Sequence, residues 1–303
     1  MPSFQFATAD VFTRQRFGGN QLAVFPDARG LDPALMQRIA REFNFSETTF
    51  VLPPSDPKHT RRVRIFTPGS ELPFAGHPTV GTAFVLATLG DIEARDSETR
   101  IVFEEGVGPV LVTIRSENGA PGFAQLTAAK LPEFGPPPPS AADLARAIGL
   151  NAADIVSGSF SPEAASCGVP FLFVPVKDRP TLGRARVRLD EFEKALSDYW
   201  TQKVFVFCDD PELAGSHFRA RMFAPTIGVA EDPATGSAVA AFAGYLAKRD
   251  ARRDGTLRWV IEQGFEMGRP SILEAEADVR GGAVTAVRVG GHSVLVSRGE
   301  FIV

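Results

Sequence analysis

Two segments of the chain contain a glycine followed by an apolar run: residues 75–83 (AGHPTVGTA) and residues 235–243 (TGSAVAAFA). Each pattern predicts a glycine turn that opens a buried helix. The first N–H groups of a helix have no partners within the helix, and the helix dipole gives that end partial positive charge. Two such openings that faced one cleft would bind an anionic small molecule from both sides. The pattern therefore favours an enzyme with a small anionic substrate.

Composition limits the size of the fold and the class of partner. The chain has 303 residues, of which 44% are hydrophobic, so it can bury a large core, and its length predicts two domains. The net charge is -4 and the basic residues are scattered, which argues against nucleic acid or an anionic membrane as a partner. No uncharged segment is long enough to span a membrane, and the two cysteines, Cys167 and Cys208, are too few for a disulfide scaffold. We expect a soluble, cytoplasmic protein.

The first half of the chain combines strands with two helices. The hydrophobic pattern predicts strands over 4–12, 21–25, 48–52, 62–66, 100–104 and 110–114. Asp32 followed by Pro33 predicts the start of one helix, and the uncharged run near 79–89 predicts a second helix enclosed by sheet. Five of the nine residues at 131–139 are prolines, which lack a backbone donor and fix φ, so this proline-rich segment cannot continue a helix or a sheet interior and we place the domain boundary there.

The order of elements then recurs in the second half. A helix that starts at Ser140 precedes predicted strands over 171–176, 204–207 and 218–223. The motifs RIFTP at 64–68 and RMFAP at 221–225 are 157 residues apart, and the glycines that open the two apolar helices are 160 residues apart. An internal duplication would arrange equivalent parts around a pseudo-twofold axis. Both helix openings would then point into the crevice between the domains, where pockets often lie.

Five segments resemble the signature motifs of the phenazine-biosynthesis isomerase (PhzF-like) family. They follow one another along the chain: 19–20 (GN), 46–51 (SETTFV), 73–79 (PFAGHPT), 231–238 (EDPATGSA) and 263–271 (QGFEMGRPS). The family is similar in fold to diaminopimelate epimerase and proline racemase. The resemblance implies an α+β fold of two pseudo-symmetric domains, each a curved mixed β-sheet wrapped around a central apolar helix.

The domain limits follow from this fold and from the proline-rich segment. We assign residues 1–128 to the first domain, with its central helix near 79–89. Residues 129–303 form the second domain, with its central helix near 236–248 and a last strand that can cross to the first domain.

Proton transfer by Glu47 is what the resemblance implies for the chemistry. Racemases of related fold use two cysteines, one before each helix-opening glycine, but Ala75 and Thr235 stand at those positions here. Neither side chain exchanges a proton with a carbon acid as a thiolate does, which excludes a two-cysteine mechanism. In the family, the glutamate that matches Glu47 takes a proton from one carbon of a cyclic dihydro-hydroxyanthranilate and returns it at another. Desolvation at the rim of a cleft would raise the pKa of Glu47 for this role, whereas on its own Glu47 is more typical of an exposed carboxylate.

His77 and Asp232 complete the catalytic set that the resemblance implies. His77 would assist proton movement or hydrogen-bond the substrate, and Asp232 would hold His77 or an amino group of the substrate. Taken alone, His77 is equally typical of a packed core residue, and Asp232 is more typical of a helix cap. Donors for the substrate carboxylate and for developing negative charge would come from Asn20, Ser46, Gly76, Gly236 and Ser237. Asn20 is also typical of a turn, and Ser237 of a helix cap.

Other combinations of reactive residues have less support. Ser237, His77 and Asp232 have the residue types of a hydrolase triad, but the chain lacks the G-x-S-x-G turn that exposes a nucleophile. The four histidines show no paired ligand spacing, so no metal site is predicted. The glycines at 106 and 108 lack the third glycine and the following helix of a nucleotide-binding turn. Cys167 is more typical of a small buried residue than of a reactive thiol.

The sequence and the resemblance together predict a cofactor-free isomerase. It would move a proton between carbons of a small, cyclic, carboxylate-bearing amino acid by general acid/base catalysis. Two alternatives stay open: an epimerase or racemase-like enzyme for another amino or hydroxy acid, and a non-catalytic protein of the same fold that binds a small molecule. The resemblance also implies a homodimer.

Overall fold

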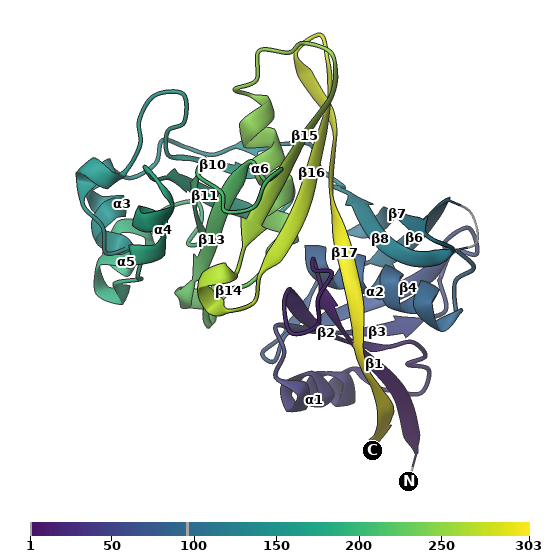
Figure 1. Ribbon diagram of the computed structural model, residues 1–303. Helices are drawn as coiled ribbons and strands as arrows, with labels where there is room; N and C mark the ends of the chain where they lie inside the picture. Colours follow the sequence, from purple (N-terminus) through teal and green to yellow (C-terminus); the bar gives the residue numbers. More distant parts are fainter. Residues whose placement is uncertain (1, 95–96) are drawn as a thin grey trace. The chain divides into compact units, whose positions relative to one another are not determined.

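Strands form most of the regular structure in the computed structural model, which describes residues 2–94 and 97–303 (Figure 1). The result is a mixed, sheet-dominated α+β fold with few helices. Contacts between Cα atoms divide the chain into unit 1, which comprises Met1–Ala129 and Val289–Val303, and unit 2, which comprises Lys130–Arg288. No helix in the described part of the chain is long and apolar enough to cross a membrane.

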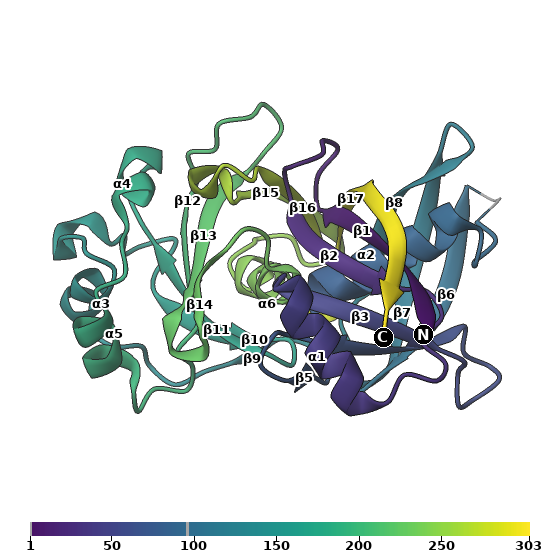
Figure 2. The same ribbon diagram turned by 90° about the horizontal axis from the view of Figure 1, so that it is seen from below.

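Unit 1 packs strands around one apolar helix. Its strands are β1 (Ser3–Val11), β2 (Asn20–Phe25), β3 (Glu47–Leu52), β4 (Arg61–Phe66), β5 (Glu71–Leu72), β6 (Glu98–Glu105), β7 (Gly108–Glu117), β8 (Ala120–Thr127) and the part of β17 (Ala283–Ile302) from Val289 onward. Its helices are α1 (Pro33–Phe43), which packs on β3 and β4, and α2 (Gly76–Leu89) (Figure 2). All residues of α2 from Gly76 to Ala87 are buried, because β1, β2, β3, β7 and β8 contact it.

The two helices of unit 1 begin where local chemistry allows. Asp32 caps α1 by accepting a hydrogen bond from the Leu35 N–H at 2.9 Å, and Pro33 occupies the first helical position, as predicted. α2 begins at Gly76, three residues earlier than the predicted 79–89. Pro78 is compatible with this early start, because the first turn of a helix needs no intrahelical N–H donor.

β17 joins the end of the chain to its beginning. It pairs antiparallel with β1 along Ser3–Val11, and the Val303 N–H donates to the Pro2 carbonyl at 3.0 Å. Figure 1 shows both termini at the same end of unit 1. β17 starts at Ala283, within unit 2, and belongs to unit 1 from Val289 onward.

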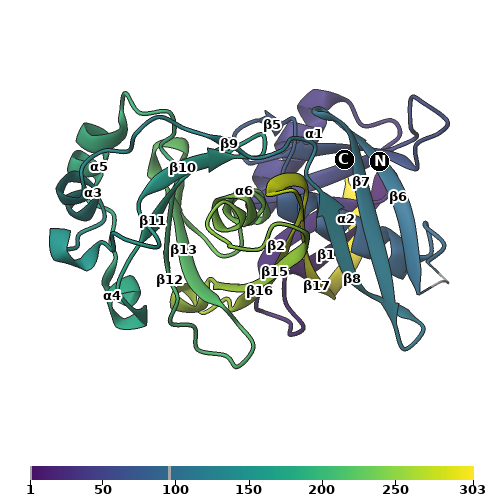
Figure 3. The same cartoon turned by 90° about the horizontal axis from the view of Figure 1, so that it is seen from above.

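Unit 2 also encloses an apolar helix. Its strands are β9 (Glu133–Phe134), β10 (Glu163–Ser166), β11 (Pro170–Pro175), β12 (Val204–Cys208), β13 (Phe218–Ala224), β14 (Val229–Asp232), β15 (Gly255–Gln263) and β16 (Ser271–Arg280). Its helices are α3 (Ala141–Ala147), α4 (Arg179–Arg184), α5 (Leu189–Leu196) and α6 (Gly236–Ala247), and short 3-10 turns are η1 (Ala152–Asp154), η2 (Pro225–Ile227) and η3 (Phe265–Met267). Figure 3 looks along α6, which contacts β10, β11, β15 and β16. The proline-rich segment contributes only the two-residue strand β9, which pairs with β10.

The two units repeat one order of strand pairing. In unit 1, β1–β2 is antiparallel, β2–β3 parallel, β3–β4 antiparallel, β4–β6 parallel and β6–β7 antiparallel. In unit 2, the same directions hold for β10–β11, β11–β12, β12–β13, β13–β15 and β15–β16. The register agrees as well: Leu22 pairs with Glu47 and Arg62 with Glu104 in unit 1, as Leu172 pairs with Val204 and Arg219 with Glu262 in unit 2. Side-chain bonds repeat too, since Glu104 accepts from Ser55 N and Asp56 N, and Glu262 from Glu212 N and Leu213 N.

Gly81 sets how closely α2 approaches the sheet. A Cβ atom at this position would lie 2.5 Å from Val11 Cγ2 and 2.6 Å from Leu22 Cδ2. We expect Gly81→Ala to destabilise the protein by about 1–3 kcal/mol, because overpacking outweighs the better helix propensity of alanine. Urea unfolding followed by circular dichroism measures this change.

Gly183→Ala is the matched control for Gly81→Ala. Gly183 lies in α4, and a Cβ atom there would have nothing within 4 Å. This control is expected to be neutral or to stabilise by up to about 1 kcal/mol. Equal unfolding midpoints for both variants would contradict the tight contact of α2 with β1 and β2.

Candidate functional site

The opening of α2 and the starts of two parallel strands bring three polar side chains together in unit 1. Asn20 begins β2, Glu47 begins β3, and His77 is the second residue of α2. His77 Nε2 lies 3.5 Å from Glu47 Oε2, and Asn20 Nδ2 lies 3.3 Å from His77 Nδ1. The side chains of His77 and Glu47 are only 5% and 15% exposed. Glu47 is therefore a largely buried carboxyl group against an imidazole, and the interpretation of it as an exposed carboxylate is wrong.

Burial determines the protonation state of His77. Desolvation lowers the pKa of His77 from 6.5 to about 3, against a weaker opposite effect of a backbone hydrogen bond with Gln21. The distance to Glu47 is within ion-pair range, but a neutral ring makes this a contact between a carboxyl group and an imidazole, not an ion pair. A neutral imidazole has one donor and one acceptor nitrogen, which suits a group that assists proton movement.

The buried imidazole predicts a loss of stability in acid. Unfolded His77 binds a proton below pH 6.5, whereas native His77 binds it only near pH 3, so stability is lost as the pH falls through this window. As the pH falls, we expect the unfolding equilibrium constant of the wild type to rise more steeply than that of His77→Asn. The difference is up to about tenfold for each pH unit. Urea titrations between pH 7 and pH 4 measure the two slopes. His217→Asn is the control for the substitution itself, and equal slopes for wild type and His77→Asn would contradict the neutral buried ring.

In unit 2, the opening of α6 is held by the side chain of Gln263. Thr235 Oγ1 donates to Asp232 Oδ2 at 2.5 Å, and Thr235 N donates to Gln263 Oε1 at 3.1 Å. Gln263 Nε2 donates to the Asp232 carbonyl at 2.8 Å and to Thr235 Oγ1 at 2.9 Å. Gln263 is fully buried, and these bonds supply partners both for its own amide group and for the polar groups of the turn before α6. The N-cap of α6 is Thr235, and the interpretation of Asp232 or Ser237 as the helix cap is wrong.

The motif at 263–271 packs against the turn before α6. Gly264 has φ +78°, and a Cβ atom there would lie 2.5 Å from both the Pro233 and the Arg269 carbonyl oxygens. Next to it, Arg219 bonds Glu262 at 3.0 Å and Glu266 at 3.1 Å. The guanidinium of Arg219 also lies 3.7 Å from the centre of the Phe265 ring. The sequence assigned no role to this motif, and the structure shows that it fixes the segment that carries Asp232.

The repeat shows where the two units differ. Strand register and helix position equate four positions of unit 1 with four of unit 2: Asn20 with Pro170, Glu47 with Val204, Leu72 with Asp232, and His77 with Ser237. The repeat of strand pairing therefore does not depend on Glu47, His77 or Asp232, because the other copy forms the same pairing without them. The ionisable members of these pairs occur in one copy each, which makes them candidates for function.

The predicted substrate-binding residues lie at the ends of these elements. Gly76 and Gly236 are the buried first residues of α2 and α6, and Ser237 is half-buried on the first turn of α6. Ser46 is exposed in the bend before β3. The structure thus groups Asn20, Glu47, Gly76 and His77 in unit 1 and Asp232, Gly236 and Ser237 in unit 2. That the two groups share one cleft stays a prediction.

The cysteines are poor candidates for chemistry. Both are free and buried, and burial raises the pKa of each thiol to about 12. A thiolate is the reactive form, so Cys167 is the small buried residue that its sequence context favours. Within residues 2–94 and 97–303, no three His, Cys, Asp or Glu side chains are grouped so that they could hold a metal ion.

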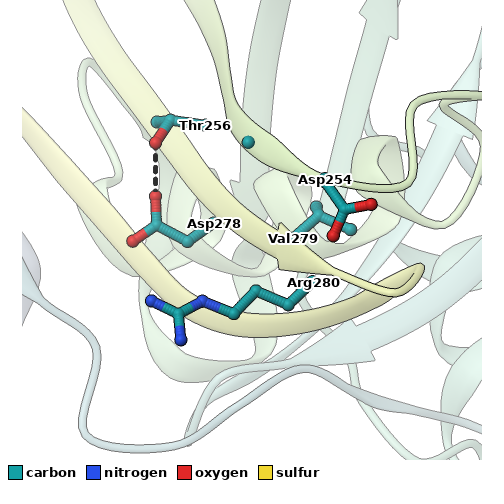
Figure 4. A pocket seen from close by; sticks show the side chains of 6 residues that line it. Asp254, Thr256, Asp278, Val279 and Arg280 are labelled. Atoms are coloured by element: carbon teal, nitrogen blue, oxygen red, sulfur yellow. Dashed lines mark hydrogen bonds between the residues drawn. The ribbon is translucent and has the colours of Figure 1, made fainter.

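A surface hollow of about 440 Å³ lies elsewhere, at one end of the β15–β16 hairpin (Figure 4). Its lining consists of Asp254, Gly255, Thr256, Asp278, Val279 and Arg280. Asp278 is already bonded to Arg288 at 2.7 Å and to Thr256 at 2.6 Å, and the bond to Arg288 is the main cause that lowers the pKa of Asp278 to about 2. Asp278 is therefore held as a paired carboxylate in this hollow, and the helix openings remain the candidate site.

Sequence reasoning missed two buried polar residues behind the openings, Gln263 and Glu105. A signal for them exists in the repeat. Gly106 and Gly264 are 158 residues apart, and a Cβ atom on either would collide with a proline residue, Pro73 or Pro233, of the turn before the helix. The residue before each glycine is therefore equivalent in the two units.

Solved structures place the fold in a known class. The structure of a hydroxyproline epimerase from Agrobacterium vitis with bound trans-4-hydroxy-L-proline has a TM-score of 0.64 over 98% of this chain and 92% of that chain, at 16% identity. A phenazine biosynthesis protein of the PhzF family from Bacillus anthracis matches with a TM-score of 0.89 over 100% of both chains, at 28% identity. The fold is that of the proline racemase and epimerase class.

Sequence comparison defines the family. The pattern of the phenazine biosynthesis-like protein family, PhzC-PhzF, matches residues 9–299, so the chain belongs to this family. It is 44% identical to an uncharacterized isomerase from Mesorhizobium japonicum over 100% of both chains. It is 36% identical to trans-2,3-dihydro-3-hydroxyanthranilate isomerase from Pseudomonas fluorescens over 98% of this chain and 99% of that protein. These matches confirm the predicted resemblance and make the chain a member of an isomerase family.

Proposed function

We propose that this protein is a cofactor-free isomerase for trans-2,3-dihydro-3-hydroxyanthranilate or a closely similar cyclic amino acid. The observation that carries the proposal is the buried contact of 3.5 Å between Glu47 Oε2 and His77 Nε2 at the opening of α2. The named activity of the Pseudomonas fluorescens relative supplies the substrate class. Ala75 and Thr235 stand where related racemases need thiols, which favours isomerisation over two-cysteine racemisation.

In the proposed mechanism Glu47 acts first as base and then as acid. Its carboxylate takes a proton from one ring carbon, the electron pair left behind shifts the double bonds, and the same carboxyl group returns a proton to another carbon. The neutral His77 hydrogen-bonds the carboxyl group or the substrate while charge develops. Asp232 binds the amino group, and the N–H groups at Gly76 and Gly236 bind the substrate carboxylate. This requires that the two pseudo-symmetric units open onto one cleft, which is part of the proposal.

Incubation of the wild-type protein with this substrate in deuterated water tests the proposal. Proton NMR is expected to show conversion of the substrate, with deuterium on a ring carbon of part of the product. The Pseudomonas fluorescens enzyme under the same conditions is the positive control. Unchanged substrate where that control is complete would overturn the proposal for this substrate, and label entering proline or hydroxyproline instead would favour the epimerase alternative. Binding of any of them without exchange would favour a non-catalytic protein.

A further inference from the structure

Glu105 occupies in unit 1 the place that Gln263 occupies in unit 2. β6 runs parallel to β4 with Arg62 opposite Glu104, and β15 runs parallel to β13 with Arg219 opposite Glu262. Glu105 and Gln263 are the next residues of β6 and β15, and each is followed by the glycine that packs on the turn before the central helix. Both side chains are buried. An ionisable acid therefore stands where the other copy uses an amide.

The oxygen atoms around Thr79 require one proton more than a carboxylate would supply. Thr79 Oγ1 lies 2.7 Å from the Ala75 carbonyl oxygen and 2.6 Å from Glu105 Oε1. A hydroxyl group carries one proton and a carbonyl oxygen carries none. The two contacts are both short, and each can be a full two-centre hydrogen bond only if Thr79 donates to Ala75 and Glu105, protonated, donates to Thr79.

The surroundings of Glu105 favour this neutral form. Glu105 Oε2 has no hydrogen-bond partner among the described residues, so a charge on this group would lack solvation. Burial raises the pKa of Glu105 to about 8, against the weaker effect of the bond to Thr79. The other ionisable groups on the adjoining elements are Glu98, Arg100 and Glu104 on β6, Arg61, Arg62 and Arg64 on β4, Glu71 on β5, Arg115 and Glu117 on β7, and His77 on α2. None of these ten is a cause of the shift.

We propose that Glu105 is a neutral carboxylic acid that donates to Thr79 and thereby fixes the backbone at Ala75, where α2 opens. The Ala75 carbonyl oxygen accepts from both the backbone N–H and the hydroxyl group of Thr79. The backbone bond is long at 3.4 Å, whereas the hydroxyl bond is 2.7 Å. His77 follows Ala75 by two residues. Glu105 is thus a positioning residue for the proposed isomerase, and it does for α2 what the Gln263 amide does for α6.

The two copies of this device differ in their response to pH. The Gln263 amide does not titrate, whereas Glu105 loses its donor when it ionises. Because the folded pKa of Glu105 is raised from 4.5 to about 8, its contribution to stability is complete below pH 4.5 and is lost as the pH rises toward 8. Glutamine at position 105 would keep a donor at every pH in this range.

The first test is the stability of Glu105→Gln, which needs no substrate and is independent of the proposed function. As the pH rises from 4.5 to 8, we expect the unfolding equilibrium constant of the wild type to rise relative to that of this variant. The expected rise is up to about tenfold for each pH unit. The control is Glu98→Gln, which removes an exposed carboxyl group from the same strand. Difference infrared spectra at pH 6 should show a protonated carboxylic acid band that Glu105→Gln loses and Glu98→Gln keeps. Parallel pH profiles of stability, or absence of that band, would overturn the neutral acid.

The second test concerns the positioning role and rests on the proposed function. In the isomerase assay, Glu105→Gln is expected to keep kcat within about threefold of the wild type at pH 6 and to retain it above pH 8, where the wild type declines. Glu105→Leu, which has no donor, should lower kcat/KM at every pH, because the Gly76 N–H and His77 both follow Ala75 directly and are displaced together. A wild-type kcat that does not decline relative to Glu105→Gln above pH 8 would overturn positioning. Lack of activity in all variants including wild type, with the stability result intact, would refute the proposed function and leave the neutral acid standing.

Discussion

Glu47→Gln is expected to lower kcat/KM for the isomerisation by about 10²–10⁴-fold, the usual contribution of a general acid/base group. Glutamine keeps the size of the side chain and its contact with His77 but cannot accept a proton from carbon. The fold should be unchanged, because Glu47 is the first residue of β3 and its backbone pairing with β2 does not depend on the carboxyl group. Steady-state kinetics and circular dichroism measure the two effects.

Glu42→Gln provides the matched control for this experiment. Glu42 is an exposed residue of α1, five positions before Glu47, so its carboxyl group can be removed without touching the site. We expect activity within about twofold of the wild type. Full activity in Glu47→Gln would contradict the assignment of Glu47 as the proton carrier, and an equal loss in both variants would show that the assay reports stability rather than chemistry.

Arg219→Met is expected to destabilise the protein by about 3–5 kcal/mol, the cost of leaving a buried charge without its partner. Glu262 is fully buried, and Arg219 is the cation that bonds it, at 3.0 Å. The substitution also removes the contact with Phe265 and loosens the motif that holds the Asp232 turn. Chemical unfolding in urea gives the change in free energy.

Arg258→Met distinguishes the buried pair from an ordinary ion pair. Arg258 lies on β15, as Glu262 does, and bonds Glu276 of β16 at 3.1 Å, but the Arg258 side chain is 69% exposed. Such pairs contribute about 0–1 kcal/mol, so this variant should unfold close to the wild type. If Arg219→Met were no more costly than Arg258→Met, the Arg219–Glu262 pair would not be the anchor of the 263–271 motif.

Local sequence patterns predicted part of the fold, because the start and the apolar face of an element depend on local chemistry, but they missed strands β8, β10 and β14–β16 and helices α4 and α5. Apolar runs without charge predicted α2 and α6, and both are buried along nearly their whole length. Repeated motifs at spacings of 157 and 160 residues indicated a duplication, and the strand registers of the two units agree with it. The start of α2 was misplaced by three residues because Gly76 and Pro78 resemble a turn when their neighbours are unknown.

The properties of the candidate site depend on neighbours that are distant in sequence, so the sequence left them open. The neutral state of His77 and the raised pKa of Glu105 both follow from burial, and Glu105 meets its side-chain partner Thr79 across 26 residues of sequence. The role of Gln263 likewise depends on Asp232 and Thr235, about 30 residues earlier. Motif positions identified Glu47, His77 and Asp232 as candidates, but no local pattern shows which carboxyl groups are buried and which atoms they meet.

We propose that Glu47 of unit 1 and the α6 opening of unit 2 act on one bound substrate. A crystal structure of the protein with a hydroxyanthranilate ligand tests it most directly. We expect a ligand carboxylate against the N–H groups at Gly76 and Gly236, and a Glu47 oxygen about 3 Å from a ring carbon. A ligand bound away from Glu47, or held by only one of the two openings, would contradict it.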